Sequence, residues 1–143
     1  SVVDDYNNIY QVKKNIKISC IDDGNKTYLI NGIENRIEQI IANLLDNAIS
    51  FTEENKNIEV KISKNLNKQV VINVIDEGQG FREKDTSMVF NRFYSNRPDK
   101  FGQHSGLGLN IVKNLTDLHK ASITASNRED KKGANLEIIF PKL

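Results

Sequence analysis

Apolar residues recur along this chain at two spacings, and the spacing changes from one segment to the next. Between Asn31 and about Phe51 they lie three and four residues apart, which predicts an amphipathic helix. Residues 107–119 repeat that pattern and predict a second long helix. Asn31 is the expected N-cap of the first helix, because Glu34 follows three residues later as in a capping box.

Short alternating or continuous apolar runs predict the strands. Ile16–Ile21 alternates, and a turn at residues 22–25 would pair it with Thr27–Ile30 in a hairpin. The other predicted strands are Ile58–Ser63, Val70–Ile75, Ala121–Ser126 and Asn135–Phe140. Val70–Ile75 is apolar almost throughout, which indicates a central strand covered on at least one face.

The order of these elements indicates the fold class. Helices interleave with strands, which predicts an α+β fold, a two-layer sandwich of a mixed, mostly antiparallel sheet packed on helices. Residues 1–14 form an irregular or helical lead-in in this prediction. Residues 82–105 are mostly polar, with a short helix expected near Asp85–Phe90, and a connection of this length is expected to be a lid. No repeat or linker divides residues 1–143, so we predict a single domain.

The composition narrows the function classes. The 143 residues are 38% hydrophobic and 27% charged, with a net charge of +1, which fits a globular protein and gives no electrostatic reason to expect nucleic acid or membrane as a partner. The single cysteine, Cys20, excludes an internal disulfide and fits a reducing compartment, and its alternating run places it on a buried strand face. Because the chain does not begin with Met, we expect it to be part of a longer protein.

Four segments, residues 43–48, 76–80, 90–94 and 105–109, carry the candidate chemistry. In the first, Asn43 and Asn47 lie four residues apart and therefore share a helix face. Amide oxygens are hard neutral ligands that suit Mg²⁺ bridging phosphate oxygens. On this motif alone, a pair of structural amides with satisfied hydrogen bonds explains the two asparagines equally well.

The second segment places Asp76 directly after an apolar strand and before Gly78 and Gly80. A carboxylate there could accept a hydrogen bond from an exocyclic amine such as that of adenine. The glycines would let the backbone approach a flat ligand closely. Taken alone, the pattern is more typical of an ordinary turn after a strand.

The last two segments would complete a nucleotide site. The run Gly106, Leu107, Gly108 and Leu109 opens the second helix, whose first N–H groups could bind phosphate. Arginines in the expected lid, Arg97 among them, could reach a γ-phosphate. Ordinary packing is the more common role for aromatic residues such as Phe93, and His119 is expected to interact with the end of its helix.

Together and in this order, the four segments resemble the N, G1, F and G2 boxes of the catalytic ATP-binding domain of bacterial sensor histidine kinases. That domain belongs to the superfamily shared with DNA gyrase B, Hsp90 and MutL. The resemblance runs from about Ile16 to Leu143 and includes a weaker last glycine box at residues 133–135. Residues 93–98 and 101–106 look most like the ChvG/ExoS-type kinases of alphaproteobacteria. The implied fold is a Bergerat-type α/β sandwich with a flexible lid over ATP.

The resemblance also implies roles for single residues. Asn47 would hold Mg²⁺ with Asn43 beside the phosphates, and Asp76 would bind the adenine amine between Gly78 and Gly80. Gly106 and Gly108 would hinge the lid and receive the phosphates. Arg97 would supply the lid cation, since Ser95 stands where many relatives carry arginine. The remaining nucleotide contacts would come from Phe93, Tyr94, His104, Ser105, Leu107 and Leu109.

The implied activity is transfer of the γ-phosphoryl group of Mg-ATP to a histidine on a separate dimerisation domain, and then to a response regulator. Neither His104 nor His119 has the setting of that histidine, so we expect an isolated cytoplasmic module of a kinase anchored in the inner membrane. An ATP hydrolase of the gyrase or Hsp90 kind is the first alternative, although it carries glutamate where this chain has Asn43. A degenerate nucleotide-binding or interaction module is the second, suggested by Ser50 and Ser95 where relatives often carry cations.

Overall fold

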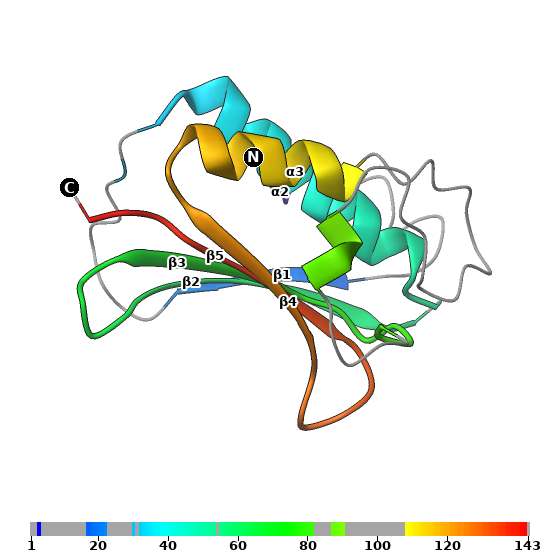
Figure 1. Ribbon diagram of the computed structural model, residues 1–143. Coiled ribbons are helices and arrows are strands. Elements are labelled where there is room, and N and C mark those ends of the chain that lie inside the picture. Colours follow the sequence, from blue (N-terminus) through cyan, green and yellow to red (C-terminus); the bar gives the residue numbers. More distant parts are fainter. Residues whose placement is uncertain are drawn as a thin grey trace.

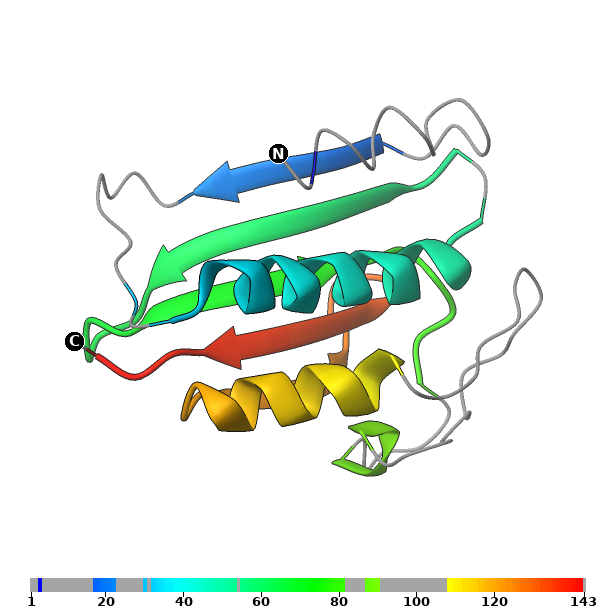
Figure 2. The same ribbon diagram turned by 90° about the horizontal axis from the view of Figure 1, so that it is seen from above.

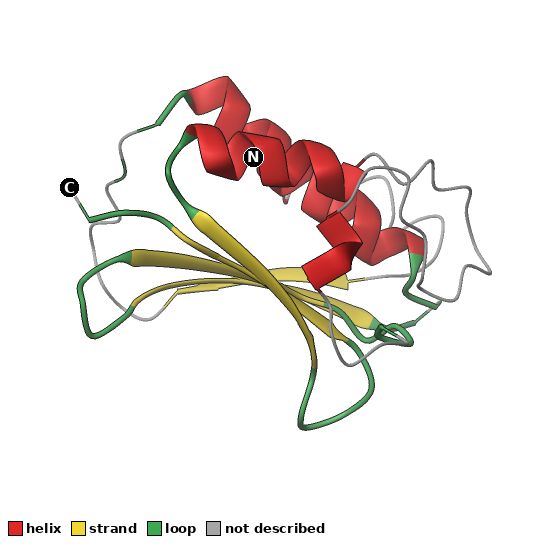
Figure 3. Ribbon diagram, in the orientation of Figure 1, coloured by secondary structure: helices red, strands yellow, loops and turns green. Residues whose placement is uncertain are grey.

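The computed structural model describes residues 17–22, 30, 32–53, 55–81, 87–90 and 108–142, together with Val3. Within them, one sheet lies under two long helices that both cover the same face (Figure 1). The elements are β1 (Lys17–Asp22), α2 (Glu34–Ser50), β2 (Asn57–Lys64), β3 (Val70–Ile75), the 3₁₀ turn η1 (Ser87–Phe90), α3 (Gly108–Leu118), β4 (Ser122–Asn127) and β5 (Ala134–Ile139). The predicted two-layer sandwich is confirmed, and Figure 3 separates its helical and strand layers by colour.

The sheet is mixed and mostly antiparallel, as predicted. Its strands follow the order β1-β2-β3-β5-β4, and only β1 and β2 run parallel among the described strands. β3 lies in the centre, where Ile72 is opposite Ile62 of β2 and Ile138 of β5. Because strands on both sides complete its hydrogen bonds, β3 can carry the apolar sequence that predicted a central strand.

The partner of β1 differs from the prediction. We expected Ile16–Ile21 to form a hairpin with Thr27–Ile30, but β1 pairs in parallel with β2, with Ile18 opposite Ile58. Ile30 lies outside any strand, and residues 23–29 lie outside the described part of the chain. A parallel pair needs a long crossover connection, and α2 is part of that connection here. Alternation along one strand does not indicate which partner the strand will find.

The start of α2 is also different from the prediction. The helix begins at Glu34 with Ile33 as its N-cap, and no side chain caps it locally, so the predicted capping box is wrong. Instead, the N–H of Ile33 donates to Nε2 of the buried His119 at 3.1 Å. Since that nitrogen must accept, the ring proton sits on Nδ1, which donates to the carbonyl of Leu115 at 2.8 Å. His119 therefore contacts the end of its own helix, as expected, and also ties it to the start of α2.

The core fills the space between the sheet and the helices. Figure 2 shows α2 and α3 running side by side above the strands, with β1 at the far edge of the sheet. The buried residues of this layer include Ile40, Leu44, Leu45, Ala48, Ile58, Val60, Ile72, Val74, Val112, Leu136 and Ile138. Each large aliphatic side chain buried in this way stabilises the fold by about 1.5–3 kcal/mol. No helix in the described part of the chain has both the length and the apolar character needed to cross a membrane.

The predicted lid lies almost entirely outside the described residues. The exception is η1, a 3₁₀ turn where a short helix was expected near Asp85–Phe90. Val89 and Phe90 of this turn are buried in the core, and the side chain of Asn110 on α3 donates to the carbonyl of Phe90 at 3.1 Å. Phe90 is therefore a packing residue that connects the turn to the helix layer.

Candidate functional site

Helix α2 carries the two asparagines of the first segment. Its apolar stripe packs on the sheet, which fixes the rotation of the helix and leaves Asn43 half-buried. Asn47, one turn later, is only 6% exposed, and its helix neighbours Leu44, three residues before, and Ala48, the next residue, are buried. A buried amide is costly unless it is hydrogen-bonded, so its place on this helix indicates a specific polar environment. The shared helix face that the spacing predicted is therefore partly buried.

Asp76 is the first residue after β3, and its carboxylate is held in one orientation. It is 2% exposed. Its Oδ1 accepts two main-chain hydrogen bonds, from Gly78 at 2.9 Å and from Ala134 at 3.1 Å. Its own N–H donates to the carbonyl of Ala134 at 2.9 Å. These bonds fix both the backbone and the side chain of Asp76 at the junction of β3 and β5.

The backbone at Gly78 brings the second segment against the first. A Cβ atom on Gly78 would lie 2.3 Å from the carbonyl oxygen of Phe51, the residue that caps the end of α2. Only glycine allows the loop to pass this close to the helix end. Asn47 lies one turn before Phe51, so the structure brings the asparagine helix and the Asp76 loop together, as the sequence predicted.

Asn127 at the end of β4 fixes the other end of the loop. Its Oδ1 accepts the N–H of Phe81 at 2.6 Å, and its Nδ2 donates to the carbonyl of Phe81 at 3.1 Å. The same Oδ1 would lie 2.6 Å from a Cβ on Gly80. The sequence analysis did not identify Asn127, because an asparagine at the end of a strand normally indicates only a turn.

The hairpin between β4 and β5 contacts the main-chain carbonyl of Asp76. Nη1 of Arg128 donates to the main-chain carbonyl of Asp76 at 3.2 Å. Gly133 has φ +148°, and a Cβ there would lie 2.1 Å from the same carbonyl oxygen. The sequence analysis gave Ala134 no role, yet its main chain exchanges hydrogen bonds with Asp76 in both directions. Arg128 was missed altogether.

Arg128 is itself held by a carboxylate in the hairpin. Its Nε donates to Oδ1 of Asp130 at 3.0 Å, and its Nη2 donates to Oδ2 at 2.9 Å. The hydrogen bonds from Arg128 hold the pKa of Asp130 below its ordinary value of 3.8, and the same bonds raise the pKa of Arg128. The pair is therefore fully ionised around neutral pH.

The described part of the fourth segment is the start of α3. The helix begins at Gly108, where an added Cβ would meet no atom of the described residues within 4 Å, and Leu109 packs against the core. Seven predicted contact residues lie outside the described residues: Phe93, Tyr94, Arg97, His104, Ser105, Gly106 and Leu107. The structure thus joins the first two segments, places α3 beside α2 and leaves the lid contacts as predictions.

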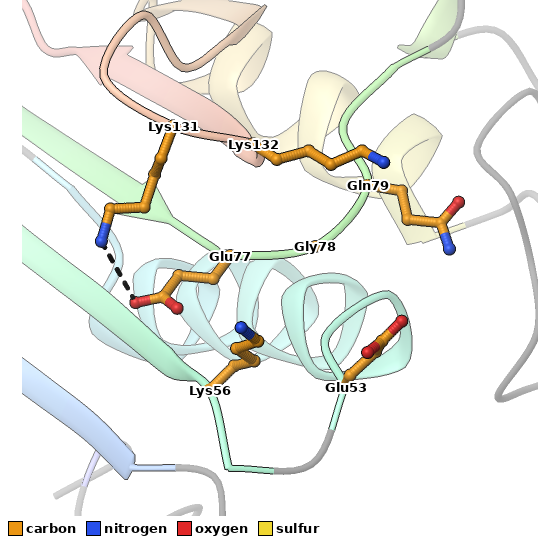
Figure 4. Close-up of a pocket in the computed structure, with 7 residues that line it drawn as sticks. All are labelled: Glu53, Lys56, Glu77, Gly78, Gln79, Lys131 and Lys132. Carbon is orange, nitrogen blue, oxygen red and sulfur yellow. Dashed lines mark ion pairs between the residues drawn. The ribbon is translucent and has the colours of Figure 1, made fainter.

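A charged pocket of about 280 Å³ opens beside the Asp76 loop (Figure 4). The pocket is lined by Gly78 and by six polar or charged side chains, those of Glu53, Lys56, Glu77, Gln79, Lys131 and Lys132. Two of these side chains form an ion pair, with Nζ of Lys131 3.7 Å from Oε1 of Glu77. Ligand pockets are usually lined mostly by apolar groups. We therefore interpret this pocket as the rim of the candidate site.

Several known proteins are similar to this chain in sequence. The family described as histidine kinase-, DNA gyrase B- and HSP90-like ATPases matches residues 32–143. The chain is 39% identical over 139 residues to the sensor protein ChvG of Agrobacterium fabrum, a match that covers 92% of this chain and 23% of that protein. It is 30% identical over 131 residues to the sensor protein kinase PmrB of Pseudomonas aeruginosa, covering 92% and 27%. The chain thus spans about a quarter of the length of these relatives.

Solved structures share the fold. The mycobacterial sensor histidine kinase MprB superposes with a TM-score of 0.82 at 20% identity, covering 98% of this chain and 93% of that one. The catalytic domain of the histidine kinase ThkA superposes with a TM-score of 0.79 at 26% identity, covering 99% and 92%. Both the predicted family and the resemblance to ChvG are confirmed by these matches. The chain belongs to the histidine kinase-, DNA gyrase B- and HSP90-like ATPases, and within them it is a catalytic domain of the sensor histidine kinase type.

Proposed function

We propose that this domain binds Mg-ATP and supplies the γ-phosphoryl group for transfer to a histidine on a separate phosphoacceptor domain. The observation that carries the proposal is the buried carboxylate of Asp76. The main-chain donors at Gly78 and Ala134 fix the orientation of this carboxylate, and in the proposal it also accepts from an adenine amine. A carboxylate fixed in this way can distinguish a base with an amine from one with a carbonyl at the same position.

Asn43 and Asn47 fit the metal that accompanies ATP. They lie on one partly buried helix face, one and two turns before Phe51, whose carbonyl lies against the Asp76 loop at Gly78. Amide oxygens suit Mg²⁺, which takes most of its remaining ligands from phosphate oxygens and water. Bound Mg²⁺ would neutralise the charge of the β- and γ-phosphates. We propose Asn47 as the metal ligand and Asn43 as its neighbour beside the phosphates.

Asn47→Ala should abolish the tightening of ATP binding by Mg²⁺. The substitution removes the proposed ligand, and because Asn47 is buried it should also cost roughly 1 kcal/mol of folding free energy. The measurement is a titration of a fluorescent ATP analogue with Mg²⁺ and with chelator, beside a melting curve. The exposed Asn114→Ala on α3 is the matched control and should keep the metal dependence. An Asn47→Ala domain that folds and keeps the full Mg²⁺ effect would refute the assignment.

Phosphoryl transfer fits the residues better than hydrolysis does. Asn43 occupies the position where the resemblance places the water-activating glutamate of hydrolases, and an amide cannot serve as a base. Transfer to a bound histidine requires mainly positioning and neutralisation of phosphate charge. In this proposal Asn43 and Asn47 act at the phosphates, and Arg97 supplies the cation of the lid.

The proposed partners follow from the relatives. ThkA, 26% identical with a TM-score of 0.78, has been crystallised in complex with the response regulator protein TrrA. By analogy, we propose that the kinase containing this domain passes its phosphoryl group to a response regulator. We also propose, from the resemblance to sensor histidine kinases alone, that the full-length protein is anchored in the inner membrane with this domain on the cytoplasmic side.

Transfer in trans tests the proposal. The domain alone, incubated with radiolabelled ATP, should retain no stable label. Addition of the dimeric acceptor domain of the same kinase should place label on that domain, and an acceptor without its histidine should stay unlabelled. Rapid phosphate release without an acceptor would favour the hydrolase. Tight ATP binding with no transfer to the acceptor would favour a non-catalytic module.

A further inference from the structure

One side chain from the β4–β5 hairpin reaches the backbone of the base-binding residue. The described hydrogen bonds of Asp76 with Gly78 and Ala134 all use main-chain N–H or C=O groups of those two residues. The bond from Arg128 is different, because a guanidinium donates to the Asp76 carbonyl at 3.2 Å. A substitution at Arg128 can therefore change the support of Asp76 and leave the main-chain bonds of the sheet in place.

Hydrogen bonds within the hairpin hold this guanidinium in place. The N–H of Arg128 donates to the carbonyl of Gly133 at 2.9 Å and closes the loop. Two parallel bonds to Asp130 fix the plane of the guanidinium and leave Nη1 directed at Asp76. A Cβ on Gly133 would lie 2.7 Å from Cδ of Arg128 and 2.1 Å from the Asp76 oxygen. Glycine thus leaves room for both groups.

Arg128 approaches Asp76 from the face of the sheet that α2 and α3 leave uncovered. It lines a groove of about 560 Å³ together with Ile75 and Asn135. These two residues are register partners, and they alternate along their strands with residues of the core. Neighbouring side chains of a strand point to opposite faces. Arg128 is therefore remote from the helix face that carries the two asparagines.

We propose that Arg128 is a positioning residue for base recognition, which it supports by holding the main-chain carbonyl of Asp76. This inference rests on the proposed nucleotide binding. The Asp76 carbonyl belongs to the peptide unit that joins Asp76 to Glu77, and the next unit carries the Gly78 N–H. A displacement of the first unit would shift the second, and with it the Gly78 N–H, one of the two described donors on Oδ1. Arg128 thus restrains the carboxylate without touching the nucleotide.

Arg128→Ala should lower the affinity for ATP by about three- to tenfold, the effect of one hydrogen bond, and leave the affinity for GTP nearly unchanged. The measured quantity is the ratio of the two dissociation constants at fixed Mg²⁺. Arg128→Lys should restore part of the ratio, because an ammonium can reach the carbonyl but cannot form the paired bonds with Asp130. Glu129→Ala, an exposed residue of the same hairpin with no role in the proposed site, is the control and should keep the parent ratio.

The ratio of the dissociation constants for ATP and GTP distinguishes a positioning role of Arg128 from a general loss of stability. A variant that is only less stable binds both nucleotides less well and keeps the ratio. In an Asp76→Asn background, Arg128→Ala should lower the ratio no further, because both residues act on one contact. A parent domain that does not bind ATP, or does not prefer it, would refute the proposed function itself. A parent that prefers ATP, with an Arg128→Ala variant that prefers it equally, would refute only the positioning role.

The ratio should also be constant from pH 8 to about pH 5. The pKa of Asp130 lies below 3.8 because Arg128 donates to both of its oxygens. A carboxylate with a lowered pKa stays ionised above that value and loses its pairing only as the pH falls through it. A fall in the parent ratio between pH 8 and pH 5 that Asp130→Asn abolishes would contradict the proposed ion pair.

Discussion

Asp76→Asn is expected to leave the fold intact and to weaken ATP binding by about ten- to a hundredfold. The asparagine amide can keep its oxygen where Oδ1 now accepts from Gly78 and Ala134. Its NH₂ group then replaces one carboxylate oxygen, so a donor is presented to the donor amine of adenine. Losing the charge-assisted bond costs about 1.5–3 kcal/mol, and the same change favours the carbonyl of guanine.

The measurement is competition between ATP and GTP for the domain, together with a melting curve. The variant should lose its preference for adenine and melt close to the parent. Asp117→Asn is the matched control, since it makes the same chemical change at an exposed carboxylate of α3 that pairs with Lys113 and lies outside the candidate site. If Asp76→Asn keeps the adenine preference, the base does not bind at this carboxylate.

Periodicity predicted the elements of this fold better than their partners. α2, β3 and β5 lie within one or two residues of their predicted bounds at most ends, because each carries a regular apolar stripe or run. The parallel pairing of β1 with β2 was missed, because it depends on where the crossover returns the chain. The cap of α2 was also missed, because the N–H of Ile33 donates to His119, 86 residues away. Local sequence carries little information on such contacts.

In the candidate site, too, the sequence indicated the local segments but not the long-range contacts. Asp76, Gly78 and the asparagines belong to short local segments, so their spacing was informative. Arg128 is 52 residues from Asp76 in the sequence, and it lies in a hairpin whose charged residues resemble any exposed turn. Asn127 is 46 residues from Phe81. These supporting contacts arise only when the hairpin folds against the end of β3.

The surroundings of Asp76, the proposed base-binding end of the site, are therefore held by three segments that are distant in the chain. The end of α2 contacts the loop at Gly78, the start of β5 bonds to Asp76, and Arg128 supports the same residue from the hairpin. Close packing leaves no room for one of these segments to move alone. Displacement of the hairpin should thus affect both stability and nucleotide selectivity.

Gly133→Ala provides that displacement, and we expect it to lower the free energy of unfolding by about 2–5 kcal/mol. Gly133 has φ +148°, a conformation that residues with a Cβ rarely adopt. The new methyl group would lie 2.1 Å from the Asp76 carbonyl oxygen, and a main-chain atom between two paired strands cannot easily move away. The hairpin must shift instead, which takes the Arg128 guanidinium and the Ala134 N–H away from Asp76.

Denaturant unfolding measures the loss of stability, and nucleotide titration well below the melting temperature measures the loss of ATP preference. Gly108→Ala is the matched control for the denaturant measurement alone, because no described residue lies within 4 Å of a Cβ built there at the start of α3. Alanine favours a helix over glycine by about 0.5–1 kcal/mol, so this control should be as stable as the parent or slightly more stable. If both variants unfold at the same denaturant concentration, the hairpin does not pack against Asp76 as described, and the support of the base end must come from elsewhere.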